Sequence, residues 1–438
     1  MSPAHRTGLD RARPASTAWL PRRRLLAGLA CAPWAAPGGA GALQGVVRDA
    51  VTGRPLPDAT VVVGSRVLAC DAQGRFDAGE PAEGTPLLAR APGHARHRGR
   101  ITATAPVVIA LQPLRPKALY LSAQGIGHAA LRAAALKLID ETELNALVID
   151  VKDDRGLVPH ASAALAAAGL PQHTVTVRDM PALLSGLRER GLYLIARIVT
   201  FKDDPYATAH PAWAVHDAAG AVWKDREGLA WIDPFRREAW ERTFALAEEA
   251  ALLGFDEIQF DYLRFPDAAG LVFAEPDTEA GRVAAIGGFL DAARRRLARH
   301  NVFIAADVFG YVAWNRDDTH IGQRLEALAG QVDYLSPMLY PSGFSFGIPG
   351  HRDPVAAPYE IVQHSLQRML ERTGLPGVRL RPWLQAFRDY AFDRRAFGAH
   401  EIRRQIDAAE ALGTNGWMLW NPGNRYQADG LARDDTPR

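Results

Sequence analysis

The chain has 438 residues, 48% hydrophobic and 23% charged, which suits two or three globular domains rather than a disordered or fibrous protein. It contains no apolar run of about 18 residues, so the sequence predicts no transmembrane segment. Residues 1–42 hold six arginines and one acid, which leaves 45 basic and 48 acidic residues in the rest of the chain. This near balance excludes the positive charge excess typical of nucleic-acid-binding proteins.

Residues 1–42 are predicted to be an export signal. Three arginines at 22–24 precede a short apolar run, and small residues then continue to Ala42, where cleavage is expected. The arginines followed by two leucines resemble a twin-arginine leader. A disordered basic tail is one alternative, and a lipoprotein anchored through Cys31 is a weaker one, because Gly28 stands where a branched apolar residue is usual. We expect an exported protein, periplasmic or extracellular, that is monomeric.

Cysteine usage predicts neither a disulfide nor a metal site. Loss of Cys31 with the leader would leave Cys70 alone, so no intrachain disulfide could form. No Cys/His spacing resembles a set of zinc ligands. The sequence also has no glycine-rich phosphate loop and no serine elbow, so we expect no metal and no cofactor.

Residues 43–113 are predicted to form a small all-β sandwich. Short branched apolar stretches alternate with turn residues such as Gly53, Asp58 and Gly74. The G-x-V-x-D…G-x-P-L-x-x-A-x-V pattern and the D-x-x-G-x-F turn at 71–76 resemble carboxypeptidase regulatory-like domains. This resemblance implies a spacer or binding module without catalytic residues. Pro113 and Pro116 indicate a linker after it, since proline cannot continue a central strand.

From Lys117 onward, short apolar stretches alternate with helical stretches rich in Ala, Leu and Arg. The predicted strands lie at 118–123, 146–151, 193–199, 257–263, 303–309, 333–339, 380–387 and 415–421. Continuous apolar strands of this kind are typical of buried parallel sheets. Eight βα units predict an α/β fold, a (β/α)8 TIM barrel over residues 117–425, followed by a C-terminal tail at 426–438.

Polar side chains gather at the C-terminal ends of the predicted strands, where TIM barrels place their active sites. The candidates are Asp150, Lys152, Arg197, Asp261, Tyr262, Arg264, Asp307, Tyr340, Gln385, Trp420 and Asn421. Asp150 and Lys152 are expected to share a face and form an ion pair at the mouth, which either binds a substrate hydroxyl or holds the loop. Tyr340 and Trp420 are the favoured platforms for sugar rings, whose apolar faces suit aromatic side chains.

Asp261 and Asp307 are the candidate catalytic pair. Gln259 and Asp261 share the inward face of their strand, and Asp307 holds the comparable place on the next strand, roughly 5 Å away. Two facing carboxyl groups are what glycoside hydrolysis requires. The alternative is that each aspartate caps a helix or pairs with an arginine. We assign Asp261 as nucleophile or base, because Arg197 and Arg264 favour a charged carboxylate, and Asp307 as proton donor.

The barrel resembles a widespread family of bacterial proteins assigned as glycoside hydrolases with a TIM-barrel domain. The resemblance rests on "ELNALVIDVKDDRG", "HPAWAV", "GFDEIQFDYLRFP", "ADVFGY" and "VDYLSPMLYPSGF". It implies hydrolysis of glycosidic bonds, and hence a polysaccharide or oligosaccharide as the partner. A catalytically inactive barrel that binds carbohydrate, with the sandwich aiding adhesion, is the alternative. Metal-dependent deacetylation is disfavoured because His/Asp clusters are missing from the sequence.

A more distant resemblance links strands 4 and 5 to the α-amylase family. "GFDEIQFD" places Asp261 at that family's nucleophile, and "IAADVFG" places Asp307 at its general acid. Gln259 stands where the family has an arginine, and the His-Asp pair after strand 7 is missing, with Gln385 in its place. The resemblance therefore does not carry over retention of configuration, although Asp150 could replace the missing third carboxylate.

Overall fold

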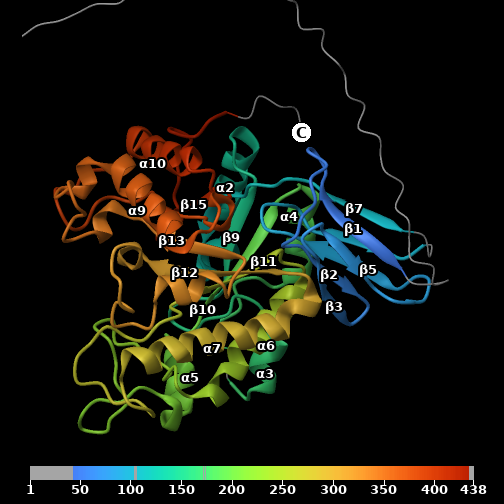
Figure 1. Ribbon diagram of the computed structural model, residues 1–438. Coiled ribbons are helices and arrows are strands. Elements are labelled where there is room, and N and C mark those ends of the chain that lie inside the picture. Colours follow the sequence, from blue (N-terminus) through green and yellow to red (C-terminus); the bar gives the residue numbers. More distant parts are fainter. Residues whose placement is uncertain (1–42, 103–105, 171, 173, 434–438) are drawn as a thin grey trace, which may run out of the picture. The chain divides into compact units, whose positions relative to one another are not determined.

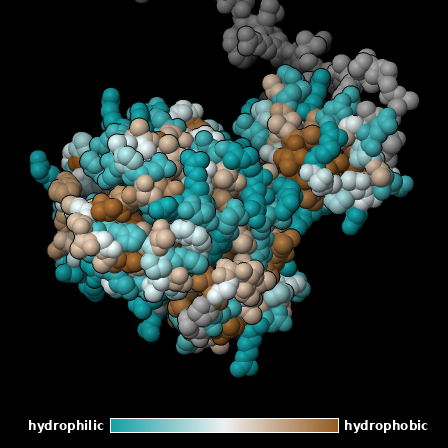
Figure 2. Space-filling model, turned by 90° about the horizontal axis from the view of Figure 1, so that it is seen from below, coloured by the Kyte–Doolittle hydropathy of each residue, from teal (hydrophilic) through white to brown (hydrophobic). Residues whose placement is uncertain are grey.

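The computed structural model describes residues 43–102, 106–170, 172 and 174–433 (Figure 1). The predicted export signal and Cys31 lie outside these residues, so export stays a prediction. No helix within the described ranges is both long and apolar enough to cross a lipid bilayer. Figure 2 shows hydrophilic residues over much of the face it presents, with smaller hydrophobic patches between them.

Seven strands between residues 44 and 111 form two β-sheets. One sheet has the order β4-β1-β7, with β1 at Gln44–Asp49, β4 at Arg75–Asp77 and β7 at Val107–Leu111. The other has the order β3-β2-β5-β6, with β2 at Thr60–Val63, β3 at Arg66–Ala69, β5 at Pro86–Arg90 and β6 at His97–Arg100. Both sheets contribute side chains to one buried hydrophobic cluster, which includes Val47, Val61 and Ile109. The predicted all-β fold of this segment is confirmed.

Eight parallel strands form a closed barrel in the order β10-β11-β12-β13-β14-β15-β8-β9. Their bounds are Lys117–Leu121 for β8, Ala146–Lys152 for β9, Tyr193–Val199 for β10, Glu257–Asp261 for β11, Phe303–Phe309 for β12, Tyr334–Met338 for β13, Trp383–Gln385 for β14 and Trp417–Trp420 for β15. The predicted TIM barrel is confirmed, and β10 and β12 have the bounds expected from the sequence.

Helices surround the barrel and cover the outer faces of its strands (Figure 1). Their bounds are Ala123–Gly127 (α1), Ala129–Glu141 (α2), Ala163–Ala167 (α3), Met180–Glu189 (α4), Asp204–Ala209 (α5), Trp240–Leu253 (α6), Glu279–Leu297 (α7), Leu325–Ala329 (α8), Pro358–Thr373 (α9) and Ala399–Ala411 (α10). The helix expected after the first barrel strand is split into α1 and α2, because His128 has extended backbone and caps α2 by accepting the Leu131 N–H.

The interior of the barrel is polar at successive levels of β11. Glu257, Gln259 and Asp261 alternate along this strand and all are buried. The Glu257 carboxylate forms an ion pair of 2.6 Å with Arg381, and neither side chain is exposed. Gln259 donates to the Ser336 hydroxyl at 3.1 Å. An unpaired buried charge is costly, and Arg381 neutralises Glu257, the residue at the start of the strand. Asp261 lies at the C-terminal end of the same strand.

Closure of the barrel between β15 and β8 depends on Gly416. Its φ is +73°, and a Cβ atom there would lie 1.9 Å from the Pro116 carbonyl oxygen, which accepts the Trp417 N–H. We predict that Gly416→Ala lowers the free energy of unfolding by at least about 2 kcal/mol, measured by urea denaturation. Gly186→Ala, on the exposed face of α4 with open space around the new Cβ, should raise it by about 0.5–1 kcal/mol. Equal midpoints for both variants would contradict this account.

Candidate active site

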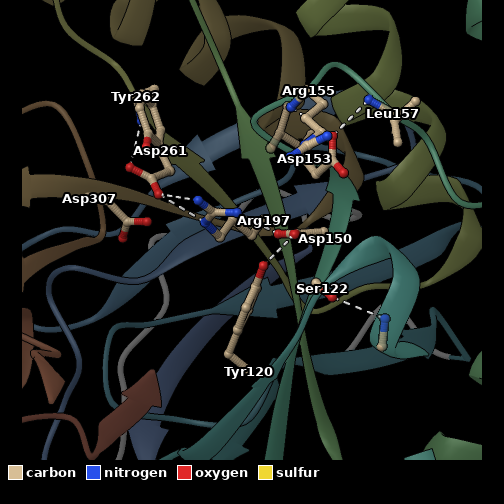
Figure 3. Close-up of polar contacts among 12 residues, drawn as sticks. Tyr120, Ser122, Asp150, Asp153, Arg155, Leu157, Arg197, Asp261, Tyr262 and Asp307 are labelled. Atoms are coloured by element: carbon tan, nitrogen blue, oxygen red, sulfur yellow. Dashed lines mark hydrogen bonds and ion pairs between the residues drawn. The ribbon is translucent and has the colours of Figure 1, made fainter. Parts of the chain in front are cut away.

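Arg197 joins two carboxylates at the C-terminal end of the barrel (Figure 3). It lies on β10, between β9 and β11, with its side chain directed into the barrel. Its Nη1 donates to Asp150 Oδ1 at 2.6 Å, and its Nε and Nη2 donate to Asp261 Oδ2 at 2.9 and 2.5 Å. All three side chains are at most 8% exposed. One guanidinium therefore fixes the positions of two acids that come from its neighbouring strands.

Tyr120 closes the other side of this group. Its hydroxyl donates to Asp150 Oδ2 at 2.6 Å, so both oxygens of Asp150 are engaged. Burial raises the pKa of Asp150 to about 6, against the opposing effect of Arg197. The Tyr120 ring stacks on Trp420 with centroids 4.0 Å apart, and the Arg197 guanidinium lies 4.9 Å from the Trp420 ring centroid. One face of Trp420 is thus already covered within the protein.

Asp307 has a different environment from Asp261. Its Oδ1 accepts the Trp383 indole N–H at 2.8 Å, whereas its Oδ2 is buried and has no partner among the described residues. Burial raises the pKa of Asp307 well above the ordinary value, and the neighbouring charge of Asp261 raises it further. A carboxyl group in this position favours the protonated form, which can donate a proton.

Asp261 and Asp307 lie at the same level of the barrel. The register of β11 against β12 pairs Gln259 with Ala305 and Phe260 with Ala306, and the two aspartates follow directly. Figure 3 shows the Asp307 carboxyl directed toward the Arg197–Asp261 pair. The nearby charge of Asp261 also contributes to the raised pKa of Asp307. The structure therefore brings the predicted pair together.

The backbone turns sharply after Asp261. Tyr262 has a φ of 47°, a region that tyrosine rarely adopts, and its N–H donates to Asp261 Oδ1 at 2.6 Å. Backbone strain of this kind costs of order 1–3 kcal/mol and often marks functional sites. The Arg264 guanidinium lies 4.9 Å from the Trp231 ring centroid and 5.3 Å from that of Tyr262, and it forms no ion pair with any described residue. Among the residues that the structure describes, Arg197 is the cation that forms an ion pair with Asp261.

The expected ion pair between Asp150 and Lys152 is wrong. In the register of β9 against β10, Asp150 lies opposite Arg197 and Lys152 lies opposite the next residue, Ile198. Val151 is therefore an extra residue in β9 and forms a bulge. The bulge turns Lys152 to the outer face of the strand. There its ammonium group donates to Asp203 at 2.6 Å, and the side chain is fully buried. Lys152 therefore lies outside the barrel interior and away from the carboxylate pair.

Two other candidates have their polar groups used within the protein. The Gln385 side chain accepts the Ser342 N–H at 3.0 Å and donates to the Ser342 hydroxyl at 2.7 Å. The Asn421 amide donates to the Ala386 carbonyl oxygen at 2.6 Å and accepts the Gly423 N–H at 2.8 Å. Tyr340 packs against the buried cluster of the barrel interior that contains Trp383, the partner of Asp307. Burial, together with the charges of Asp307 and Asp261, raises the pKa of Tyr340 well above the ordinary value.

Tyr120 and Trp383 were missed in the sequence analysis, although each holds one of the acids. Both lie in the barrel interior, on strands that have no charged residue at their C-terminal ends. Tyr120 reaches Asp150 from the adjacent strand and Trp383 reaches Asp307 from two strands away, so an interpretation based on charged residues at strand ends does not include them. Among the described residues, no group of three or more His, Cys, Asp or Glu side chains could hold a metal ion.

The stability of the site should depend on Arg197. We predict that Arg197→Leu lowers the free energy of unfolding by about 3–5 kcal/mol, because it leaves two buried acids without their cation. Arg190→Leu removes an exposed ion pair with Asp140 and should change the free energy of unfolding by about 0.5 kcal/mol or less. Urea denaturation compares the two variants, and similar losses would show that the guanidinium bridge does not stabilise the barrel.

Asp307 should make the protein less stable as the pH rises. The folded chain holds its proton more tightly than the unfolded chain, whose aspartate pKa is about 3.9, so stability falls from that pH up through the raised folded pKa. Asp307→Asn mimics the protonated acid and removes this loss. We predict a thermal midpoint about 2 °C or more above wild type at pH 8 and a smaller difference at pH 4. A variant less stable than wild type at pH 8 would contradict the raised pKa.

The sequence and the structure of this chain are similar to those of known proteins. Residues 118–426 match a family model described as "Putative glycosyl hydrolase domain". A hypothetical protein from Ruminiclostridium thermocellum ATCC 27405 is 34% identical, with a TM-score of 0.39, over 43% of this chain and 97% of that one. The comparison with curated proteins gave no match.

Two solved glycoside hydrolase structures are also similar. The PgaB (BpsB) glycoside hydrolase domain from Bordetella bronchiseptica is 13% identical, with a TM-score of 0.53, over 73% of this chain and 99% of that one. A chitinase from Chromobacterium violaceum ATCC 12472 is 14% identical, with a TM-score of 0.45, over 72% and 96%. At this identity the PgaB domain supports the barrel fold alone. Because the family model spans the whole barrel, this chain belongs to the family of glycosyl hydrolase domains that the model describes.

Proposed function

We propose that this protein hydrolyses glycosidic bonds in a polysaccharide, with Asp261 and Asp307 as its two reacting carboxyl groups. The observation that carries the proposal is the contrast between the two acids. Asp261 is ion-paired with Arg197, whereas Asp307 is buried, forms no ion pair with any described residue and has a raised pKa. Glycoside hydrolysis needs one carboxylate and one carboxylic acid side by side, and membership of the glycosyl hydrolase family supports the same chemistry.

The proposed reaction begins with proton donation. The Asp307 proton passes to the glycosidic oxygen as the bond between that oxygen and the anomeric carbon breaks, so the departing sugar leaves as a neutral alcohol. The Asp261 carboxylate then acts in one of two ways. It either bonds to the anomeric carbon, or it takes a proton from the water that attacks this carbon. In the first case, water then attacks the anomeric carbon, its bond to Asp261 breaks, and the ionised Asp307 takes the proton from that water. In the second case, Asp261 releases the water's proton to solvent and Asp307 takes up a proton from solvent before the next turnover.

Arg197 and Asp150 act as positioning residues in this scheme. Arg197 holds the Asp261 carboxylate in one orientation, and Asp150 together with Tyr120 holds Arg197. Such preorganisation matters because a reacting group that is misplaced by about 1 Å loses about a hundredfold in rate. The α-amylase family has an arginine at the position of Gln259. In this chain the guanidinium that contacts Asp261 belongs to Arg197, on the neighbouring strand β10.

The proposed activity can be tested by incubating the purified protein with a panel of soluble bacterial and plant polysaccharides and measuring new reducing ends. We predict release from at least one substrate. On that substrate, Asp307→Asn should lower kcat by about 10²–10⁴-fold, because the general acid is lost, and Asp261→Asn should lower it at least as much. Asp291→Asn, in an exposed pair on α7, serves as the control and should retain full activity.

Circular dichroism and thermal melting must show that the variants are folded. Activity retained in Asp261→Asn would remove the proposed pair. A folded wild-type protein that binds a polysaccharide without cleaving any member of the panel would favour the inactive carbohydrate-binding barrel instead.

A further inference from the structure

Two aromatic side chains lie stacked on the segment that follows β14. The rings of Phe387 and Tyr390 have centroids 6.1 Å apart and an interplanar angle of 11°. Tyr390 is 55% exposed, so a large part of this residue is open to solvent. A tyrosine as exposed as this contributes little to the core, and the stacking holds its ring in one orientation. The pair therefore offers a flat aromatic surface in a fixed position.

This surface is continuous with the candidate active site. The Phe387 ring also contacts the Tyr340 ring edge to face, with centroids 5.5 Å apart. Tyr340 in turn packs against the buried cluster of the barrel interior that contains Trp383, whose indole N–H donates to Asp307 Oδ1 at 2.8 Å. A row of three aromatic rings therefore runs outward from the carboxyl pair, from Tyr340 through Phe387 to Tyr390.

The segment that carries the two rings is held by one buried carboxylate. Asp389 Oδ1 accepts the Ser342 hydroxyl at 2.7 Å and the Ala391 N–H at 3.1 Å. Its Oδ2 accepts the N–H groups of Phe392 and Arg394, both at 2.9 Å. Gln385, a predicted substrate-binding residue, also holds Ser342 by donating to its hydroxyl at 2.7 Å. The network from Gln385 through Ser342 to Asp389 thus fixes the backbone on both sides of Tyr390.

We propose that Phe387 and Tyr390 form an outer sugar-binding platform, on which a glycan chain rests as it leaves the carboxyl pair past Tyr340. Sugar rings have apolar faces that pack on flat aromatic side chains. A surface that adjoins the reacting groups through a continuous row of rings suits a further unit of the same chain. This inference rests on the proposed function and goes beyond it, because it assigns a binding subsite and predicts that the enzyme favours long chains over single glycosides.

The test compares a polymer with a small substrate on the full-length protein. The polymer is the polysaccharide that wild type cleaves in the panel, and the small substrate is the 4-nitrophenyl glycoside of its constituent sugar. Tyr390→Ala should lower kcat/KM on the polymer about tenfold or more and leave hydrolysis of the small glycoside within about twofold. Tyr390→Phe keeps the aromatic face and should retain the wild-type rate on the polymer.

Phe346→Ala is the matched control. This ring is 87% exposed, and its ring contact is with Tyr311 rather than with the row. The control should leave both substrates unaffected. Equal losses on polymer and small glycoside in Tyr390→Ala, equal losses in Tyr390→Ala and Phe346→Ala, or no loss at all would each overturn the platform.

Binding separates this inference from the proposed function. Native gels containing each polysaccharide of the panel report retardation of the protein whether or not bonds are cleaved. If wild type cleaves none of them, the proposed function fails, and the platform is judged from the gels. Retardation of wild type and Tyr390→Phe, but not of Tyr390→Ala, would then support the platform. Unchanged mobility of wild type in every gel would overturn it.

Discussion

The guanidinium of Arg197 sets the arrangement of charge at the mouth of the barrel. Parallel strands bring Asp150, Arg197 and Asp261 to neighbouring places on β9, β10 and β11, and the side chains meet inside a space from which water is largely excluded. Two carboxylates this deeply buried would repel each other and lose their hydration. One planar cation that donates to both removes most of that cost and also fixes their directions.

The same arrangement explains why Asp307 differs from Asp261. Arg197 donates its hydrogen bonds to Asp150 and Asp261, so within the described part of the chain the donor to the Asp307 carboxyl is the neutral indole N–H of Trp383. A single neutral donor does not offset burial beside a second acid, and the carboxyl therefore favours its proton. Of the two acids on adjacent strands, Asp261 thus has the cation, and Asp307 is buried beside it with a raised pKa. This division is what acid-assisted cleavage of a glycosidic bond requires.

The barrel could be predicted from the sequence because buried parallel strands are short, continuous apolar runs, and each of the eight runs became a strand. The pair of aspartates could be predicted for a related reason, since residues two apart share a face and strand ends meet at the mouth. Lys152 shows where that reasoning fails. One inserted residue, Val151, reverses the face of the next side chain, and nothing in the local pattern of "ALVIDVK" reveals a bulge.

The hydrogen-bonding partners of the acids were also beyond the sequence. Tyr120 on β8 holds Asp150 on the adjacent strand β9, whereas Trp383 on β14 holds Asp307 on β12, two strands away, so this second contact depends on the curvature of the closed sheet. Gln385 was correctly placed at a strand end, but its amide is used by Ser342, a residue in the loop after another strand. A strand-end position therefore predicts where a side chain lies, whereas its hydrogen-bonding partner decides what the side chain is free to do.

The account depends most directly on the protonation of Asp307, which carbon-13 NMR of protein labelled at the aspartate carboxyl carbons can follow. The Asp307 resonance is identified by its loss in Asp307→Asn. Exposed aspartates titrate near their ordinary pKa of about 3.9. The account predicts that Asp307 keeps the chemical shift of a protonated carboxyl well above that pH, until its own raised pKa is reached. An Asp307 resonance that titrates together with the exposed aspartates would contradict it.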